Sequence, residues 1–311
     1  MNLSEHDETL DPEDWDEARR VGHLMIDDML DYLKTVRDRP AWRSVPGETK
    51  AALDEAAPIN GAPLAEIYDT FKTHVLPYPT GNLHPGFFGW VMGNGTVTGM
   101  FADMLASGMN PHVGGYDQSA TLIERQVTSW FAEFLGYPKN ASGLLVSGAT
   151  MANINGIAVA RNEKAGYDIR KLGLQHKGAP RLRIYGSAET HNWILKACEL
   201  MGLGCDAFRA ISVNDSYEID IAACRNAIQQ DIDNGDKPFC LLGSAGTVNT
   251  GAIDDLRGLR ALADDFDMWF HIDGAFGSLA ALSAKARPMV EAQSLADSIA
   301  FDLHKWAYLP Y

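Results

Sequence analysis

Short apolar segments alternate with turn-forming and helical patterns along the chain after residue 143, and this arrangement predicts an α/β fold. The segments that fit β-strands are residues 182–185, 208–213, 239–243, 268–272 and 298–303. The clearest helical patterns are residues 119–134, 219–232 and 254–266. Strands that alternate with helices in this way predict a mostly parallel sheet flanked by crossover helices.

The N-terminal part of the chain has a long helical pattern instead. Asp11 and Pro12, followed by acidic residues, predict a helix that starts there and continues to about residue 39. Its apolar stripe consists of Val21, Leu24, Met25, Ile26, Met29, Leu33 and Val36. No partner for this stripe is evident nearby in the sequence, and residues 40–63 have the composition of a connecting arm. We therefore expect a helical segment with its arm at residues 1–75, packed on a partner subunit, and a large domain at residues 76–311.

Loop-forming residues and aromatic side chains are combined in residues 77–95. His84, Pro85, Phe87 and Phe88 are the centre of this stretch. Aromatic side chains in a loop predict the wall of a pocket, although the same side chains could simply pack the loop onto the core.

Composition and charge narrow the possible functions. The 311 residues are 46% hydrophobic and 22% charged, which is typical of a soluble globular protein. The net charge of −15, without clusters of Lys and Arg, argues against nucleic acid or an anionic membrane as a partner. No segment approaches the roughly 18 apolar residues of a membrane span, and no targeting signal is visible. A small-molecule partner is favoured.

The four cysteines predict neither a disulfide framework nor a metal site. They are Cys198, Cys205, Cys224 and Cys240, with no CxxC pair and no histidine at metal-ligand spacing. A reducing, cytoplasmic location fits best.

Candidate chemistry is found where predicted strands end, which is where open parallel sheets bind ligands. An apolar stretch at residues 144–146, read as a strand, leads into Ser147, Gly148, Ala149 and Thr150 and then a helix. Small residues let a phosphate reach the free N–H groups of a helix N-terminus, and the threonine hydroxyl adds a donor. An ordinary tight turn with a capping threonine remains the alternative.

Two further strand ends carry His191 and Asp273. An imidazole in this position can stack on a flat heteroaromatic ring, although a lone histidine is often structural. A buried carboxylate requires a cationic partner such as a protonated ring nitrogen, and Ala275 leaves space for a ring. Capping of the next element is the alternative for Asp273.

The fourth strand end carries Lys305, preceded by His304. In the segment before it, Ile299, Phe301 and Leu303 alternate with Ala300 and Asp302. An amine at the low-dielectric edge of a sheet resists protonation and can attack a carbonyl, as a Schiff-base lysine does; a solvated loop lysine is the alternative. Together, the four strand ends supply every contact that pyridoxal phosphate requires.

Six stretches resemble the group II pyridoxal-phosphate-dependent amino-acid decarboxylases, the family of aromatic-L-amino-acid, glutamate and diaminobutyrate decarboxylases. They are His84 to Phe88, Ser147 to Thr150, Thr190-His191, Gly246-Thr247 with Gly251 and Asp254, His271 to Ala275, and Asp302 to Trp306. The resemblance extends over essentially all of the chain. It implies the fold type I architecture of pyridoxal-phosphate enzymes.

The resemblance also implies individual roles. Lys305, His191 and Asp273 are expected to be catalytic. Cofactor contacts are expected from these three and from Gly148, Ala149, Thr150, Thr247, Ala275 and His304. The substrate side is expected at His84, Pro85, Phe87 and Phe88.

The implied reaction is decarboxylation of an L-amino acid to its amine and carbon dioxide by a homodimer. An aromatic substrate is favoured because Phe87, Phe88 and Trp90 offer flat apolar surface and residues 77–116 contain no Lys or Arg. A pyridoxal-phosphate aminotransferase, an aldehyde-forming relative, or an inactive fragment that acts only through subunit contacts are the alternatives.

The chain departs from the family pattern in two places. Asp302 stands where many members carry Asn, and its carboxylate would repel a phosphate if it pointed there. Family members also continue well past the lysine, whereas this sequence stops at Tyr311. We therefore expect a fragment without the C-terminal small domain, inactive alone, of an active parent.

Overall fold

The structure is a computed structural model that describes residues 9–115 and 117–311. The chain divides into two compact units: one runs to Gly89 and includes Asn94–Phe101, and the other comprises Trp90–Gly93 and Ala102–Tyr311. Helix α4 (Val97–Met109) contributes residues to both units. The domain boundary expected at residue 75 stays a prediction.

The first unit begins with α1 (Trp15–Lys34), which starts later than predicted. Asp14 is its N-cap, and Asp14 Oδ1 accepts the N–H groups of Asp16 at 2.9 Å and Glu17 at 3.1 Å. The prediction of a start at Asp11 and Pro12 was wrong because the side chain that satisfies the free N–H groups is that of Asp14. A 3₁₀ turn, η1 (Val36–Asp38), follows the helix.

A partner for α1 does exist within the chain. Helix α3 (Leu64–His74) packs on α1, and Tyr68 Oη donates to Asp28 Oδ2 at 2.8 Å. Val21 and Tyr32 of α1 are buried. The expected arm contains a short helix, α2 (Gly47–Ala52). The expectation that nothing nearby in sequence covers the stripe was therefore wrong in part.

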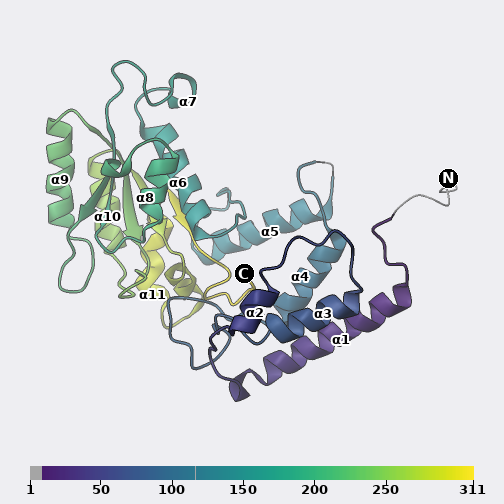
Figure 1. Cartoon of the computed structure of the whole chain (residues 1–311). Helices are drawn as coiled ribbons and strands as arrows, with labels where there is room; N and C mark the ends of the chain where they lie inside the picture. Colours follow the sequence, from purple (N-terminus) through teal and green to yellow (C-terminus); the bar gives the residue numbers. More distant parts are fainter. Residues whose placement is uncertain (1–8, 116) are drawn as a thin grey trace. The chain divides into compact units, whose positions relative to one another are not determined.

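Five parallel strands form the sheet of the second unit, in the order β2-β1-β3-β4-β5 (Figure 1). Their bounds are β1 (Leu182–Ser187), β2 (Phe208–Ile211), β3 (Lys237–Ser244), β4 (Trp269–Asp273) and β5 (Ser298–Ala300). Each overlaps a segment that the apolar pattern predicted. The prediction of a parallel sheet flanked by helices is confirmed.

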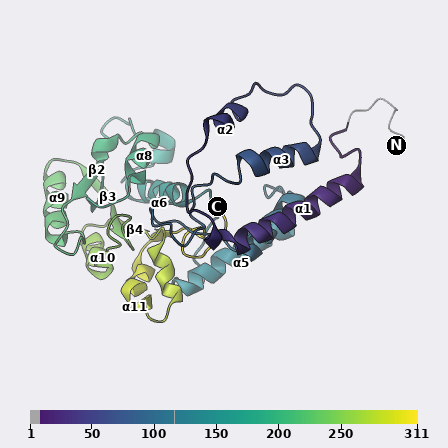
Figure 2. The same ribbon diagram turned by 60° about the horizontal axis from the view of Figure 1, so that its bottom comes forward.

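Helices cover both faces of this sheet (Figure 2). Helices α6 (Ala149–Lys164), α7 (Ile169–Leu172) and α8 (Trp193–Leu200) share one hydrophobic core with the sheet. Helices α9 (Ile221–Asp233), α10 (Leu256–Asp265) and α11 (Arg287–Val290) share the other. Helix α5 (Ser119–Phe134) has its predicted bounds, and the rings of Phe131 and Phe301 lie 5.1 Å apart. Short 3₁₀ turns are η2 (Cys205–Ala207), η3 (Gly277–Leu282) and η4 (Glu291–Leu295).

Two strand predictions need correction. Residues 144–146 form no strand, because the Leu145 N–H donates to Glu124 Oε1 at 3.0 Å rather than to a neighbouring strand. Strand β5 ends at Ala300, not at Leu303; the backbone pairing continues as far as Asp302, and the chain then turns from Leu303, whose carbonyl accepts the Leu309 N–H. Lys305 therefore lies in a turn beyond the strand.

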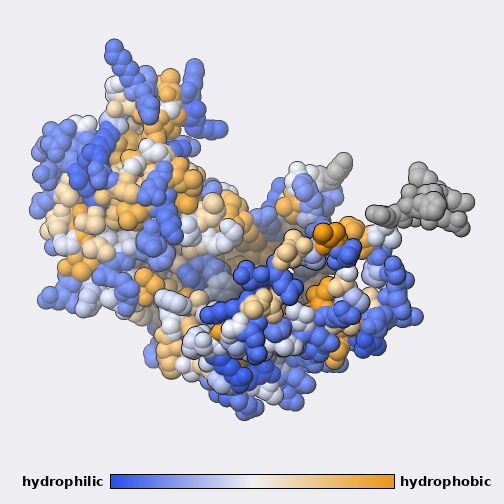
Figure 3. All heavy atoms as spheres, viewed as in Figure 1, coloured by the Kyte–Doolittle hydropathy of each residue, from blue (hydrophilic) through white to orange (hydrophobic). Residues whose placement is uncertain are grey.

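The surface of the described chain mixes hydrophilic and hydrophobic residues on the face shown in Figure 3. Within residues 9–115 and 117–311, we find no helix that is long and apolar enough to cross a membrane.

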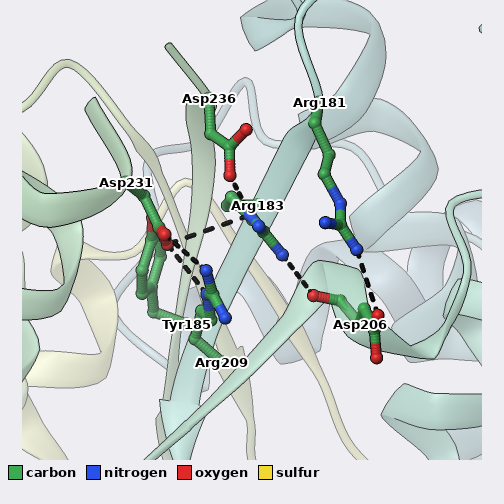
Figure 4. Close-up of polar contacts among 7 residues, drawn as sticks. All are labelled: Arg181, Arg183, Tyr185, Asp206, Arg209, Asp231 and Asp236. Atoms are coloured by element: carbon green, nitrogen blue, oxygen red, sulfur yellow. Dashed lines mark hydrogen bonds and ion pairs between the residues drawn. The ribbon is translucent and has the colours of Figure 1, made fainter. Parts of the chain in front are cut away.

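A charge network lies at the amino ends of β1, β2 and β3 (Figure 4). Asp231 Oδ2 accepts hydrogen bonds from Tyr185 Oη at 2.8 Å and Arg209 Nε at 2.9 Å. Arg183, which is 4% exposed, pairs with Asp236 at 2.6 Å. Burial alone would raise the pKa of Asp231, but the hydrogen bonds from Arg209 and Tyr185 outweigh it and hold this pKa below its usual value.

We predict that Asp231→Ala lowers the free energy of unfolding by about 3 kcal/mol at neutral pH, because Arg209 and Tyr185 lose a buried partner. Asp265→Ala is the control: it removes an exposed ion pair with Arg225 and should cost less than about 1 kcal/mol. Urea unfolding measures both. The contribution of Asp231 should disappear as the pH falls below about 3.8, its usual pKa. Equal losses in the two variants would contradict a stabilising network.

Candidate active site

A cavity of about 550 Å³ lies in the second unit at the carboxyl ends of the strands. Every residue predicted for catalysis or cofactor contact lines it: Gly148, Ala149, Thr150, His191, Thr247, Asp273, Ala275, His304 and Lys305. Trp90, Val91, Met92, Trp193, Asp302 and Tyr311 also contribute to the lining. Residues from seven separate segments thus meet in one place, at the carboxyl ends of the parallel strands, where open sheets of this kind bind ligands.

The N-terminus of α6 opens onto this cavity. Gly148 is the N-cap with φ of 133°, and no side chain caps the free N–H groups of the first turn. A Cβ atom on Gly148 would lie 3.7 Å from His304 Cε1 and 3.9 Å from Asp302 Oδ1. The glycine therefore keeps clear a space bounded by backbone donors, an imidazole and the Asp302 carboxylate, and the backbone donors fit a phosphate group.

Asp273 is fixed by two neutral donors. Asp273 Oδ2 accepts from the indole Nε1 of Trp193 at 2.5 Å, and Oδ1 accepts from the Ala275 N–H at 3.1 Å. Both donors hold the carboxylate without neutralising it, so a cationic ring nitrogen remains a suitable partner. Trp193 was not predicted, because in sequence a tryptophan in an apolar helix is indistinguishable from a core residue.

Behind Asp273, a buried histidine anchors α6 to the sheet. His271 Nε2 lies 2.8 Å from Asn153 Oδ1 of α6, and Nδ1 lies 2.7 Å from Ser298 Oγ of β5. Gly156 of α6 leaves room for the imidazole, since a Cβ there would lie 2.5 Å from its Cε1. Burial lowers the pKa of His271 to about 3, so the ring is neutral.

Lys305 has an ionic partner that was not foreseen. Its Nζ lies 2.9 Å from Asp302 Oδ2, and the same oxygen lies 3.6 Å from His304 Nε2. The Asp302 side chain is 3% exposed. The expectation that Lys305 lies where a strand ends was therefore wrong, because the lysine is in a turn beyond β5, where a buried carboxylate holds it.

Close backbone approach brings residues 90–92 into the lining. A Cβ atom on Gly93 would collide with the carbonyl oxygens of His304 and Lys305. Only glycine permits this approach, which positions Trp90 and Met92 beside the lysine segment.

The residues predicted for the substrate side, His84, Pro85, Phe87 and Phe88, belong to the other compact unit. Within that unit, His84 lines a separate pocket of about 360 Å³. A place for these four residues at the active site stays a prediction.

Two residues after β3 have different roles: Thr247 lines the cavity, and Asp254 supports the backbone. Thr247 Oγ1 lies 2.6 Å from Thr250 Oγ1. Asp254 instead accepts the N–H groups of Ile219 at 2.8 Å and Ser244 at 2.7 Å. Burial raises the pKa of Asp254 to about 6.

Comparison with known proteins gives consistent results. Residues 46–310 match the pyridoxal-dependent decarboxylase conserved domain. An aromatic-L-amino-acid decarboxylase of Bacillus atrophaeus is 32% identical over 299 residues, which cover 95% of this chain and 60% of the relative. A phenylacetaldehyde synthase of Arabidopsis thaliana is 29% identical over 309 residues, which cover 96% of this chain and 62% of the relative.

A solved structure of TDC from Oryza sativa with PLP superimposes with a TM-score of 0.85 at 26% identity. The superposition covers 96% of this chain and 66% of that chain. The present chain thus spans about 60% of the length of the curated relatives described above.

The matched range includes every lining residue of the cavity except Tyr311, and it includes all four segments that fit pyridoxal phosphate. The chain therefore belongs to the pyridoxal-dependent decarboxylase family, whose cofactor is pyridoxal phosphate.

Proposed function

We propose that this chain carries the cofactor site of an enzyme that decarboxylates an L-amino acid, with an aromatic substrate favoured. The observation that carries the proposal is the convergence of Lys305, Asp273, His191 and the α6 N-terminus in one cavity. Pyridoxal phosphate, when bound, supplies an electron sink for the bonding electrons left on the α-carbon as carbon dioxide departs.

The chain's own residues divide the work of binding. The first-turn N–H groups of α6 and the Thr150 hydroxyl would hold the phosphate, with His304 beside them. Asp273 would hold a proton on the ring nitrogen, since a buried carboxylate favours a cationic partner. His191 and Ala275 line the same cavity and would enclose the two faces of the ring.

Lys305 would hold the cofactor covalently through Nζ until the substrate amine replaces it. The amine must give up a proton first, and Asp302 Oδ2 at 2.9 Å is the acceptor within reach. Nζ would take this proton back from Asp302 when it is free again and would then be the donor of a proton to the substrate carbon.

The lining supports the preference for an aromatic substrate. Apolar surface is supplied by Trp90, Val91, Met92 and Phe276. Among the described lining residues, Lys305 is the only lysine or arginine. An acidic substrate side chain would have no free cation there. The order we propose is aromatic, then basic, then acidic.

An aldehyde-forming reaction is the second candidate. The similarity to a phenylacetaldehyde synthase over 96% of this chain supports it. Both reactions would use the same cofactor contacts, so only the product separates them.

We also propose that the protein acts in the cytoplasm as a homodimer. Exposed apolar side chains are frequent on α4 and α5: Met104, Leu105, Met109, Leu122, Ile123, Trp130 and Phe134. Two helices with so much exposed apolar surface are suited to contact with a second copy.

Borohydride reduction in the presence of pyridoxal phosphate should attach the cofactor irreversibly to Lys305, because its Nζ lies in the cavity. Peptide mapping by mass spectrometry identifies the labelled residue. Lys196 lies on α8 and Lys171 on α7, and labelling of either instead would refute the assignment.

Trp193→Phe should weaken pyridoxal phosphate binding about tenfold, because Asp273 loses the donor that fixes its orientation. Trp269→Phe is the matched control, since its indole N–H donates to Ser298 Oγ and not to Asp273. An absorbance titration gives both dissociation constants. Equal weakening in the two variants would mean that loss of core packing, not the hydrogen bond, is responsible.

A substrate panel tests specificity. Tryptophan, tyrosine, phenylalanine, dopa, diaminobutyrate, ornithine, glutamate and aspartate are supplied in turn, and carbon dioxide, amine and aldehyde are measured. We expect the highest kcat/KM with an aromatic amino acid and amine as the product. A preference for glutamate would show that the aromatic residues serve only in packing, and aldehyde would favour the second candidate.

A further inference from the structure

The carboxylate of Asp302 is held firmly in the cavity by the backbone. Its N–H donates to the Ala275 carbonyl at 2.9 Å, which continues the pairing of β4 and β5 beyond the strands. The side chain is buried, and Oδ2 forms the 2.9 Å ion pair with Lys305 Nζ. This carboxylate therefore has little freedom to move away.

The other oxygen of Asp302 faces the start of α6. Oδ1 lies 3.9 Å from the position that a Cβ on Gly148 would take, next to the N–H groups that no side chain caps. A negative charge at a helix N-terminus is favourable by itself. The Asp302 carboxylate would share the positive end of the α6 dipole with a bound phosphate, and two anions at one helix terminus repel each other.

We propose that Asp302 lowers the affinity of this cavity for phosphorylated ligands, and that the ion pair with Lys305 moderates the effect. The ammonium group of Lys305 offsets the charge of Asp302 while the two are paired. An asparagine in this position would carry no charge and would offer an amide donor to the phosphate. The chain would thus release a phosphorylated cofactor more readily than its Asp302→Asn variant.

This inference rests on the proposed function, because it takes the cavity to be the site of pyridoxal phosphate. It can be tested without catalysis. Pyridoxine 5′-phosphate and pyridoxine share the ring but carry an alcohol in place of the aldehyde, so Lys305 forms no covalent bond with them. The ratio of their dissociation constants isolates the contribution of the phosphate.

Calorimetric titration of wild type and Asp302→Asn is the first experiment. We expect Asp302→Asn to bind pyridoxine 5′-phosphate about tenfold more tightly, which corresponds to about 1.4 kcal/mol, with pyridoxine changed less than about twofold. Glu189→Gln is the matched control, because it removes a carboxylate from the same lining but from the segment after β1. It should leave the ratio unchanged.

Lys305→Ala provides a second test through the ion pair. Without the ammonium group, the charge of Asp302 is no longer offset, so pyridoxine 5′-phosphate should bind about fivefold more weakly than to wild type. The double variant Asp302→Asn with Lys305→Ala should recover that loss, because no negative charge remains at the helix terminus.

Three results would overturn the inference: no change or weaker phosphate-ester binding in Asp302→Asn, an equal gain in Glu189→Gln, or no recovery in the double variant. A general structural effect would change the dissociation constants of both ligands by the same factor, so the ratio distinguishes it from an effect on the phosphate. If neither ligand binds wild type, the proposed function itself fails, and the inference fails with it.

Discussion

The pairing of β4 with β5 beyond the strand ends is the constraint on which the cavity depends. The Gly274 N–H donates to the Ala300 carbonyl, and the Asp302 N–H donates to the Ala275 carbonyl, both at 2.9 Å. These bonds hold the segment of Asp273 beside the segment of Lys305. A side chain at Gly274 would collide with Ser278, so the close pairing requires glycine there. The separation between the aspartate and the lysine is therefore set by the backbone and not by the side chains.

The strand-end residues could be predicted because apolar runs reveal strands, and parallel strands bring their carboxyl ends together. His191 and Asp273 were placed in this way, whereas Lys305 reaches the cavity from a turn beyond β5. Trp193 was not placed, because its contact with Asp273 joins residues 80 positions apart. The ion pair of Asp302 depends on how a turn folds after Ala300, and the apolar stretch at residues 144–146 gave no sign that it lacks a strand partner. Periodicity reports burial, whereas hydrogen-bond partners depend on tertiary structure.

The two ends of the sheet have different chemistry. At the amino ends, charged side chains pair with one another, as in Arg183 with Asp236 and Arg209 with Asp231. At the carboxyl ends, small residues such as Gly148 and Ala275 leave space, and helix N–H groups remain without a side-chain cap. The residues that stabilise the fold and the residues that line the cavity thus lie at opposite ends of the strands. A substitution at the amino edge can change the unfolding equilibrium and leave the cavity geometry intact.

The buried imidazole of His271 on β4 joins α6 to β5 and does so independently of acidity near neutral pH. With a pKa of about 3, His271 keeps the same neutral form through mildly acidic and alkaline conditions alike. Its contacts with Asn153 and Ser298 therefore do not change with pH, and the position of the α6 N-terminus does not change with them. A response of this protein to pH near neutrality would accordingly not come from His271, whereas the backbone support at Asp254, with a pKa of about 6, does titrate in that range.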